Sequence, residues 1–212
     1  MSSVPPPTSP DHVPTATAPR RISRRGMVAA VLGAAAIPAA AWALVRRDGE
    51  GESGAGPGLI SWPDAAPTGT AQGQRAPNFR LDDLDGTSHA LDAAVPEANG
   101  AVVLNFFATW CVSCRDEMPV LDAAHAAGVT VLGIDLREDA PRVRALADET
   151  GIRYPVLLDT DGSVTRAYGA TGLPTNVILA ADGVVHQVIV GPVTTESLAE
   201  SLAGVRADQA SS

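Results

Sequence analysis

The chain has 212 residues and 45% hydrophobic content, enough for the core of one ordinary domain with extensions or of two small domains. It contains no lysine, which excludes Schiff-base chemistry and a P-loop lysine. Its net charge of −9 is unevenly placed, because residues 1–47 carry six arginines and one acid while the rest is strongly acidic, so nucleic-acid binding is not expected.

The first 47 residues contain a basic region followed by an apolar run, the arrangement of an export signal. Residues 1–25, rich in Pro, Ser, Thr and Ala, predict a disordered region that ends in Ser23-Arg24-Arg25, which resembles a twin-arginine motif. Residues 26–47 follow as a signal peptide or a signal anchor built on the uncharged run 27–45. Four arginines precede this run and two follow it, which places the remainder outside the cytoplasm.

Two features of this segment favour different fates. Ala39-Ala40-Ala41 is a small-residue cleavage site, whereas Arg46-Arg47 suits an uncleaved anchor in the membrane. Residues 48–75, rich in Gly, Pro, Thr and acids, predict a flexible linker that would hold an anchored domain away from the membrane.

Strand and helix patterns alternate from residue 76 to 207, as in one α/β domain. Ranges 78–81 and 88–91 predict a hairpin, and 101–107 is a continuous apolar strand typical of a sheet centre covered on both faces. Range 111–127 predicts a helix that contains Pro119. Further strands are predicted at 129–135, 155–158, 176–180 and 184–190, helices at 141–150, 163–168 and 196–203, and a frayed tail at 208–212.

The two cysteines of the chain, Cys111 and Cys114, stand where strand 101–107 gives way to helix 111–127. Any disulfide within the chain must join them, and it closes a loop too short to add much stability. A closed zinc site needs four ligands, and the histidines are scattered. The pair therefore indicates dithiol redox chemistry, with no metal and no cofactor beyond the redox-active disulfide.

Three segments, in order, carry a family resemblance: Ala76-Pro77-Asn78-Phe79, the stretch 107–119 around the cysteines, and Gly172-Leu173-Pro174-Thr175. Residues 76–205 resemble the thioredoxin superfamily, most closely its exported thiol-disulfide oxidoreductases of the TlpA, ResA and CcmG (DsbE) type. The resemblance implies a thioredoxin-like mixed β-sheet flanked by helices, with an N-terminal β-hairpin extension. Two positions depart from patterns in the superfamily: Val112-Ser113 lacks the proline that many relatives carry second, and Asn105 stands where thioredoxin has a buried aspartate.

The resemblance also implies roles. Cys111, at the helix start where the macrodipole favours thiolate, would attack a substrate disulfide, and Cys114 would resolve the mixed disulfide. Glu117, three residues after Cys114, would move a proton to or from it. Pro174 is expected in the cis form beside the disulfide. Substrate binding is expected at Trp110, Leu173, Pro174 and Thr175, with Leu173 offering its backbone to an extended strand.

The implied function is an extracytoplasmic, monomeric reductase of other exported proteins, apocytochrome c in particular, recharged by a membrane dithiol transporter of the CcdA or DsbD type. Three alternatives stay open. The site could instead introduce disulfides. A thiol peroxidase would share the opening 76–79, but peroxiredoxins place Thr-x-x-Cys where this chain has Thr109-Trp110-Cys111. A redox-inert binding module on the same fold is the third, although such modules commonly lose a cysteine.

Overall fold

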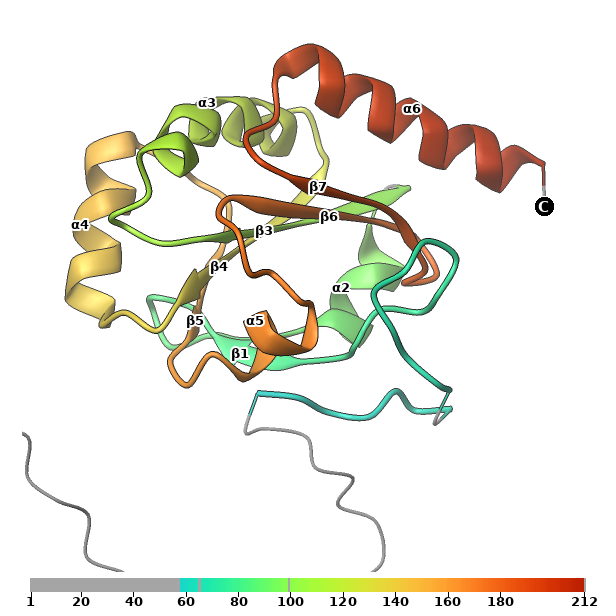
Figure 1. Cartoon of the computed structure of the whole chain (residues 1–212), viewed down its shortest axis with the longest axis horizontal. Helices are drawn as coiled ribbons and strands as arrows, with labels where there is room; N and C mark the ends of the chain where they lie inside the picture. The colour runs from blue at the N-terminus through green and yellow to red at the C-terminus, as the bar shows by residue number, and fades with distance from the viewer. Residues whose placement is uncertain (1–57, 65, 99, 212) are drawn as a thin grey trace, which may run out of the picture. The chain divides into compact units, whose positions relative to one another are not determined.

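The computed structural model describes residues 58–64, 66–98 and 100–211, and a five-stranded mixed sheet lies at their centre (Figure 1). The order of the strands across the sheet is β5-β4-β3-β6-β7. Parallel pairing joins β3, β4 and β5, while β6 is antiparallel to β3 and β7 is antiparallel to β6. The strands are β3 (Ala101–Phe107), β4 (Thr130–Leu136), β5 (Val156–Asp159), β6 (Thr175–Ala180) and β7 (Val185–Val190). The predicted thioredoxin-like α/β fold is thus confirmed.

The central strand β3 is buried along its whole length, as its apolar run predicts. Because side chains alternate along a strand, Val102, Leu104 and Phe106 enter one hydrophobic cluster, and Val103 and Phe107 enter the other. The sheet therefore has a packed core on each face.

The helices divide between these two faces. In Figure 1, α3 and α6 lie above the sheet, and α2 and α5 lie below it. Apolar residues of α3, α4 and α6 join one cluster, whereas those of α2 and α5 join the other. Their bounds are α2 (Leu91–Glu97), α3 (Val112–Ala126), α4 (Ala140–Thr150), α5 (Ser163–Ala167) and α6 (Thr195–Ala210).

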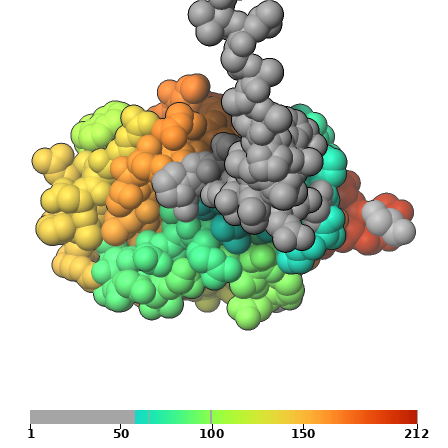
Figure 2. All heavy atoms as spheres, turned by 90° about the horizontal axis from the view of Figure 1, so that it is seen from below, coloured from blue at the N-terminus to red at the C-terminus, as the bar shows by residue number. Residues whose placement is uncertain are grey.

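The predicted N-terminal hairpin is present as a separate two-stranded antiparallel sheet of β1 (Arg80–Asp82) and β2 (Ser88–Ala90). The space-filling view of the lower face shows this hairpin, in green, alongside the orange segment that contains β5 and α5 (Figure 2). A backbone hydrogen bond of 3.2 Å from Leu84 N to Val156 O joins the hairpin loop to the outer edge of β5.

The segment before the hairpin corrects part of the predicted linker, because Trp62 and Arg75 within it pack on the domain. Trp62 is buried, its Nε1 donates to Ala76 O at 2.8 Å, and the Arg75 guanidinium lies 3.8 Å from the centre of its ring. Arg75 also bridges to Val184, so that the chain around it runs along the outer edge of β7. The Gly- and Pro-rich composition predicted a free linker, but burial of one large aromatic side chain provides enough free energy to hold this segment on the domain.

Two helices also differ from prediction. The helix α2 was not predicted, because it lacks a side-chain cap at Ala90, contains Pro96 and buries only Leu91 and Val95. The last helix, α6, continues through Gly204 to Ala210, which corrects both its predicted end and the start of the tail. A Cβ atom at Gly204 would meet the His186 ring at 2.8 Å, so this glycine permits close approach of α6 to β7 instead of ending the helix.

None of the helices in residues 58–64, 66–98 and 100–211 is both long enough and apolar enough to cross a membrane. The predicted twin-arginine motif and the signal or anchor segment at 26–47 lie outside these residues.

Candidate active site

The two cysteines form a disulfide at the point where the chain leaves β3 and enters α3. Cys111 is the N-cap residue of α3, and its Sγ accepts a hydrogen bond from Cys114 N at 3.2 Å. The Ser113 hydroxyl oxygen lies 3.6 Å from the same sulfur. Cys114 is fully buried, whereas Cys111 keeps 6% of its surface exposed, so Cys111 is the sulfur that a partner molecule can reach.

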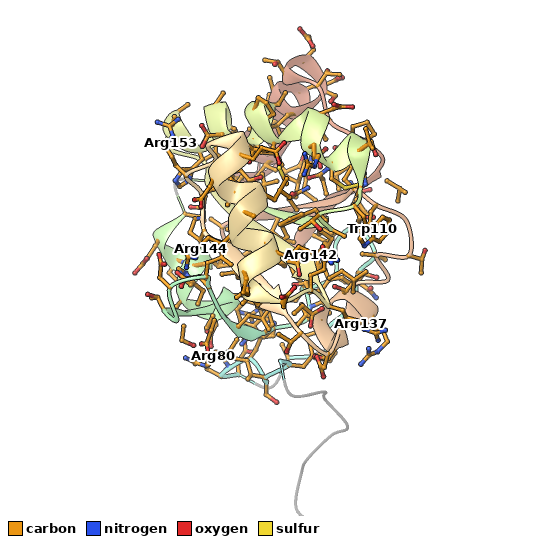
Figure 3. The ribbon with its side chains drawn as sticks, turned by 90° about the vertical axis from the view of Figure 1, so that its left-hand side faces the viewer. Arg80, Trp110, Arg137, Arg142, Arg144 and Arg153 are labelled. Carbon is orange, nitrogen blue, oxygen red and sulfur yellow. A yellow bond between two sulfur atoms is a disulfide. The ribbon has the colours of Figure 1, made fainter. Side chains whose placement is uncertain are left out.

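The side chains beside Cys111 form an exposed apolar surface. Trp110 is 67% exposed and Val112 is 72% exposed. Figure 3 shows Trp110 to the right of α4, next to the label of Arg142 in that view. Trp110, where substrate binding is predicted, is therefore accessible to another protein.

The loop before β6 reaches the same end of the sheet. The peptide bond between Leu173 and Pro174 is cis, as the resemblance predicts. Thr175 pairs with Phe106 near the end of β3, and its Oγ1 donates to Gly172 O at 2.6 Å. Leu173 packs against the hydrophobic cluster that contains Cys111 and Cys114. The structure thus brings the two predicted motifs together.

Glu117 lies inside the fold, with 1% of its surface exposed. Its carboxylate accepts hydrogen bonds from Asn105 Nδ2 at 2.6 Å, Asn176 Nδ2 at 2.9 Å and Val193 N at 2.8 Å. Asn105 and Asn176 are cross-strand partners on β3 and β6, and Asn105 Nδ2 also donates to Asn176 Oδ1 at 2.9 Å. We call these two asparagines the amide pair.

The environment of Glu117 has opposing effects on its protonation. Burial raises the pKa of Glu117, because the charged form loses its hydration. The hydrogen bonds from Val193, Asn176 and Asn105 oppose that rise by stabilising the carboxylate. Since Cys114 and Glu117 are both among the buried residues of α3, three positions apart, a buried acid with a displaced pKa lies one helical turn from the inner cysteine.

The loop that carries Cys111 is held from two sides. Thr109 donates to the Glu138 carboxylate through its backbone N at 2.5 Å and its Oγ1 at 2.6 Å. On the other side, Arg115 Nε donates to Thr109 O at 3.4 Å. These contacts fix the backbone two residues before the reactive cysteine.

Sequence reasoning missed Asn176 and Glu138. Polar residues in strands that are otherwise apolar are a usable signal, and Asn105 and Asn176 both have that character. Glu138 follows β4 in a polar loop and carries no comparable signal. Among the residues that the structure describes, no group of three or more His, Cys, Asp or Glu side chains could hold a metal ion.

Comparison with known proteins agrees with this geometry. Residues 71–203 match the model of the Redoxin family. The thiol-disulfide oxidoreductase ResA of Geobacillus thermodenitrificans is 32% identical over 143 residues, which cover 66% of this chain and 80% of that protein. The thioredoxin-like protein YneN of Bacillus subtilis is 34% identical over 140 residues, covering 63% of this chain and 80% of that protein.

A solved structure supports the same relationship. The thioredoxin-family thiol:disulfide interchange protein of Chlorobium tepidum superposes with a TM-score of 0.55 and 31% identity, covering 63% of this chain and 96% of that chain. Fold, CxxC geometry and sequence similarity agree: the chain belongs to the Redoxin family and is a thiol-disulfide oxidoreductase of the ResA type within the thioredoxin superfamily.

Proposed function

We propose that this chain is an exported reductase that opens disulfides in other exported proteins, with the haem-attachment cysteines of apocytochrome c as its substrate. The observation that carries the proposal is the asymmetry of the dithiol. Cys111 lies at an exposed apolar surface, while Cys114 is buried on the face of α3 that also carries Glu117. That arrangement suits attack on a protein disulfide by the outer sulfur and resolution by the inner one.

In the reduced enzyme, the Cys111 thiolate attacks one sulfur of the substrate disulfide and forms a mixed disulfide. The other substrate sulfur leaves as a thiolate and takes a proton from water. The Cys114 thiol then gives its proton to Glu117, and the resulting thiolate attacks Cys111 Sγ. The second substrate sulfur leaves as a thiolate, which takes a proton from water. The Cys111–Cys114 dithiol has thereby been oxidised to a disulfide, and its two electrons have reduced the substrate disulfide.

The groups around Cys111 favour the reducing direction. In the described chain, both groups within hydrogen-bond reach of its sulfur, the Cys114 amide and the Ser113 hydroxyl, are neutral. Together with the start of α3 they stabilise a thiolate moderately, whereas a strong oxidant requires an unusually stabilised thiolate. A membrane dithiol transporter of the CcdA or DsbD type would return electrons to the pair.

The reduction potential of the Cys111–Cys114 pair tests the direction, with Trp110 fluorescence in graded thiol buffers as the readout. A value near that of thioredoxin, about −270 mV, supports a reductase. A value near that of DsbA, about −120 mV, overturns that direction and leaves a disulfide-forming oxidase as the function.

An oxidised peptide with the CxxCH haem-attachment sequence tests the substrate, and the same peptide with Ala in place of His is its control. Reduction of the first peptide should be faster, should disappear in Cys111→Ser, and should stop at a mixed disulfide in Cys114→Ser. Equal rates on both peptides would remove the cytochrome assignment but leave the oxidoreductase activity.

Export is tested separately by changing Arg24 and Arg25 to lysine, which should leave the protein in the cytoplasm if the twin-arginine route is used. Unchanged export of that variant would contradict the proposed route.

A further inference from the structure

Asp135 and Glu138 form a carboxyl pair behind the redox loop. Asp135, in β4, is paired with Phe107 of β3, so it lies next to the point from which the chain continues to Cys111. Its side chain is completely buried, and its Oδ2 accepts a hydrogen bond from Glu138 N at 3.0 Å. Glu138 in turn binds both the amide and the hydroxyl of Thr109.

The charges around this pair are unbalanced. Glu138 is the group that must be ionised, because both of its oxygens accept hydrogen bonds from Thr109 and Arg142 of α4 lies 3.5 Å from one of them. Asp135 lies against that carboxylate and has Asp159 of β5 as a second acidic neighbour. Its Oδ1 has no hydrogen-bond partner among the described residues. Two adjacent carboxyl groups out of water cannot both carry a charge at low cost, so the proton resides on Asp135.

We propose that Asp135 is a positioning residue of the redox site: as a neutral acid it holds Glu138, and through Glu138 it fixes Thr109 and the approach of Cys111 to α3. The proposal rests on the redox site and is independent of the substrate and of the direction of electron flow. No hydrogen bond within the described residues joins Asp135 to either cysteine, so its effect on the reaction passes through Glu138 and the loop.

The electrostatics give this contact a pH dependence. Burial raises the pKa of Asp135 to about 8; the hydrogen bond from Glu138 N opposes that rise, and the side chain of Glu138 and the charge of Asp159 add to it. Burial acts to raise the pKa of Glu138, but the hydrogen bonds from Thr109, the Asp135 side chain and Arg142 together hold it below its usual value. The remaining charged group at the loop, Arg115 of α3, binds Thr109 O and does not compensate an added charge on Asp135. An ionised Asp135 therefore repels the Glu138 carboxylate. This repulsion weakens the two hydrogen bonds that Thr109 donates to Glu138.

The backbone amide of Thr109 reports this contact directly. The experiment follows its NMR chemical shift in the isotope-labelled full chain from about pH 6 to about pH 10, in the oxidised form so that the cysteines do not titrate. We expect an inflection near pH 8 in the wild type. Asp135→Asn, which keeps the shape and the neutral charge of the protonated acid, should match the wild-type shift at low pH and show no inflection. Asp148→Asn, the same change on the exposed surface of α4, should keep the wild-type inflection.

Two further arms complete the test. Glu138→Gln should move the Thr109 amide signal even at low pH and abolish the inflection, which gives a second variant should Asp135→Asn fold poorly. For reduction of a disulfide peptide, the ratio of kcat/KM of Asp135→Asn to that of the wild type should rise above pH 8, since the common cysteine titration cancels. An inflection that persists in Asp135→Asn, or a wild-type Thr109 signal that does not titrate, overturns the proposal while leaving the oxidoreductase activity untouched.

Discussion

The contacts of the amide pair predict how much Asn176→Leu should lower the free energy of unfolding. Leucine has nearly the shape of asparagine but neither donates to Glu117 nor accepts from Asn105, two contacts of 2.9 Å each in the wild type. A hydrogen bond to a charged group contributes about 1.5–3 kcal/mol and one between neutral groups about 1 kcal/mol. Burial of the leucine methyl groups returns roughly 1 kcal/mol, so we expect the free energy of unfolding to fall by about 1.5–3 kcal/mol near pH 8.

The loss should depend on pH, because Glu117 has a raised pKa that the variant raises further. A group whose pKa is raised by folding stabilises the fold fully below its unfolded pKa, and this stabilisation disappears as the pH rises through the folded pKa. The loss in Asn176→Leu should therefore be only about 1 kcal/mol near pH 4, where Glu117 is protonated in both proteins, and should grow as the pH rises.

Urea unfolding of the oxidised protein, followed by circular dichroism at both pH values, measures this difference. Asn78→Leu is a matched control, since the Asn78 side chain is also buried and its hydrogen bonds within the described part of the chain go to the backbone of Ser61 and Asp92. Its loss should be the same at both pH values. A loss in Asn176→Leu that is just as independent of pH would refute the conclusion that the amide pair stabilises a charged Glu117.

Three further variants test other parts of the structure by the same unfolding assay. Trp62→Ala should lower the free energy of unfolding by about 3–5 kcal/mol, and a loss below about 1 kcal/mol would contradict a packed segment before the hairpin. In the wild type, the raised pKa of Asp135 makes the free energy of unfolding decline as the pH rises from the unfolded pKa of 3.8 to the folded pKa of about 8. Asp135→Asn should reduce this decline, because the asparagine side chain binds no proton on folding. An unchanged slope would argue against a raised pKa of Asp135. Arg115→Ala should cost less than about 1 kcal/mol, since its ion pair with Glu149 is exposed to solvent, and a larger loss would show that its contact with Thr109 stabilises the fold.

The parts of the site that were predictable from sequence are local in the chain. The apolar run of β3, the CxxC pair and the three-residue spacing from Cys114 to Glu117 all express short-range geometry, so the cysteines and the acid could be placed on one helix. The cis form of Pro174 was predicted through the family resemblance, since the trans form is intrinsically favoured.

The parts that escaped prediction depend on contacts between distant segments. Asn105 and Asn176 are 71 residues apart, and only the register of β3 with β6 sets them side by side. Thr109 and Glu138 are 29 residues apart and meet because β3 and β4 end together. The burial of Glu117 has the same origin, because a glutamate on a helix surface is ordinarily solvated until strands supply its donors.

The segment around residue 75 also protects the sheet from other molecules. A sheet's outer strands present unpaired backbone groups that can pair with another chain and start aggregation. Here Gly73 N donates to Val185 O and Val185 N donates to Gln74 O, each at 2.8 Å, so the chain occupies part of the β7 edge with its own backbone. At the opposite edge, the backbone N–H of Leu84 donates a hydrogen bond to Val156 O of β5. The residues that open the domain thus occupy part of each sheet edge, and they leave fewer backbone groups there for pairing with another chain.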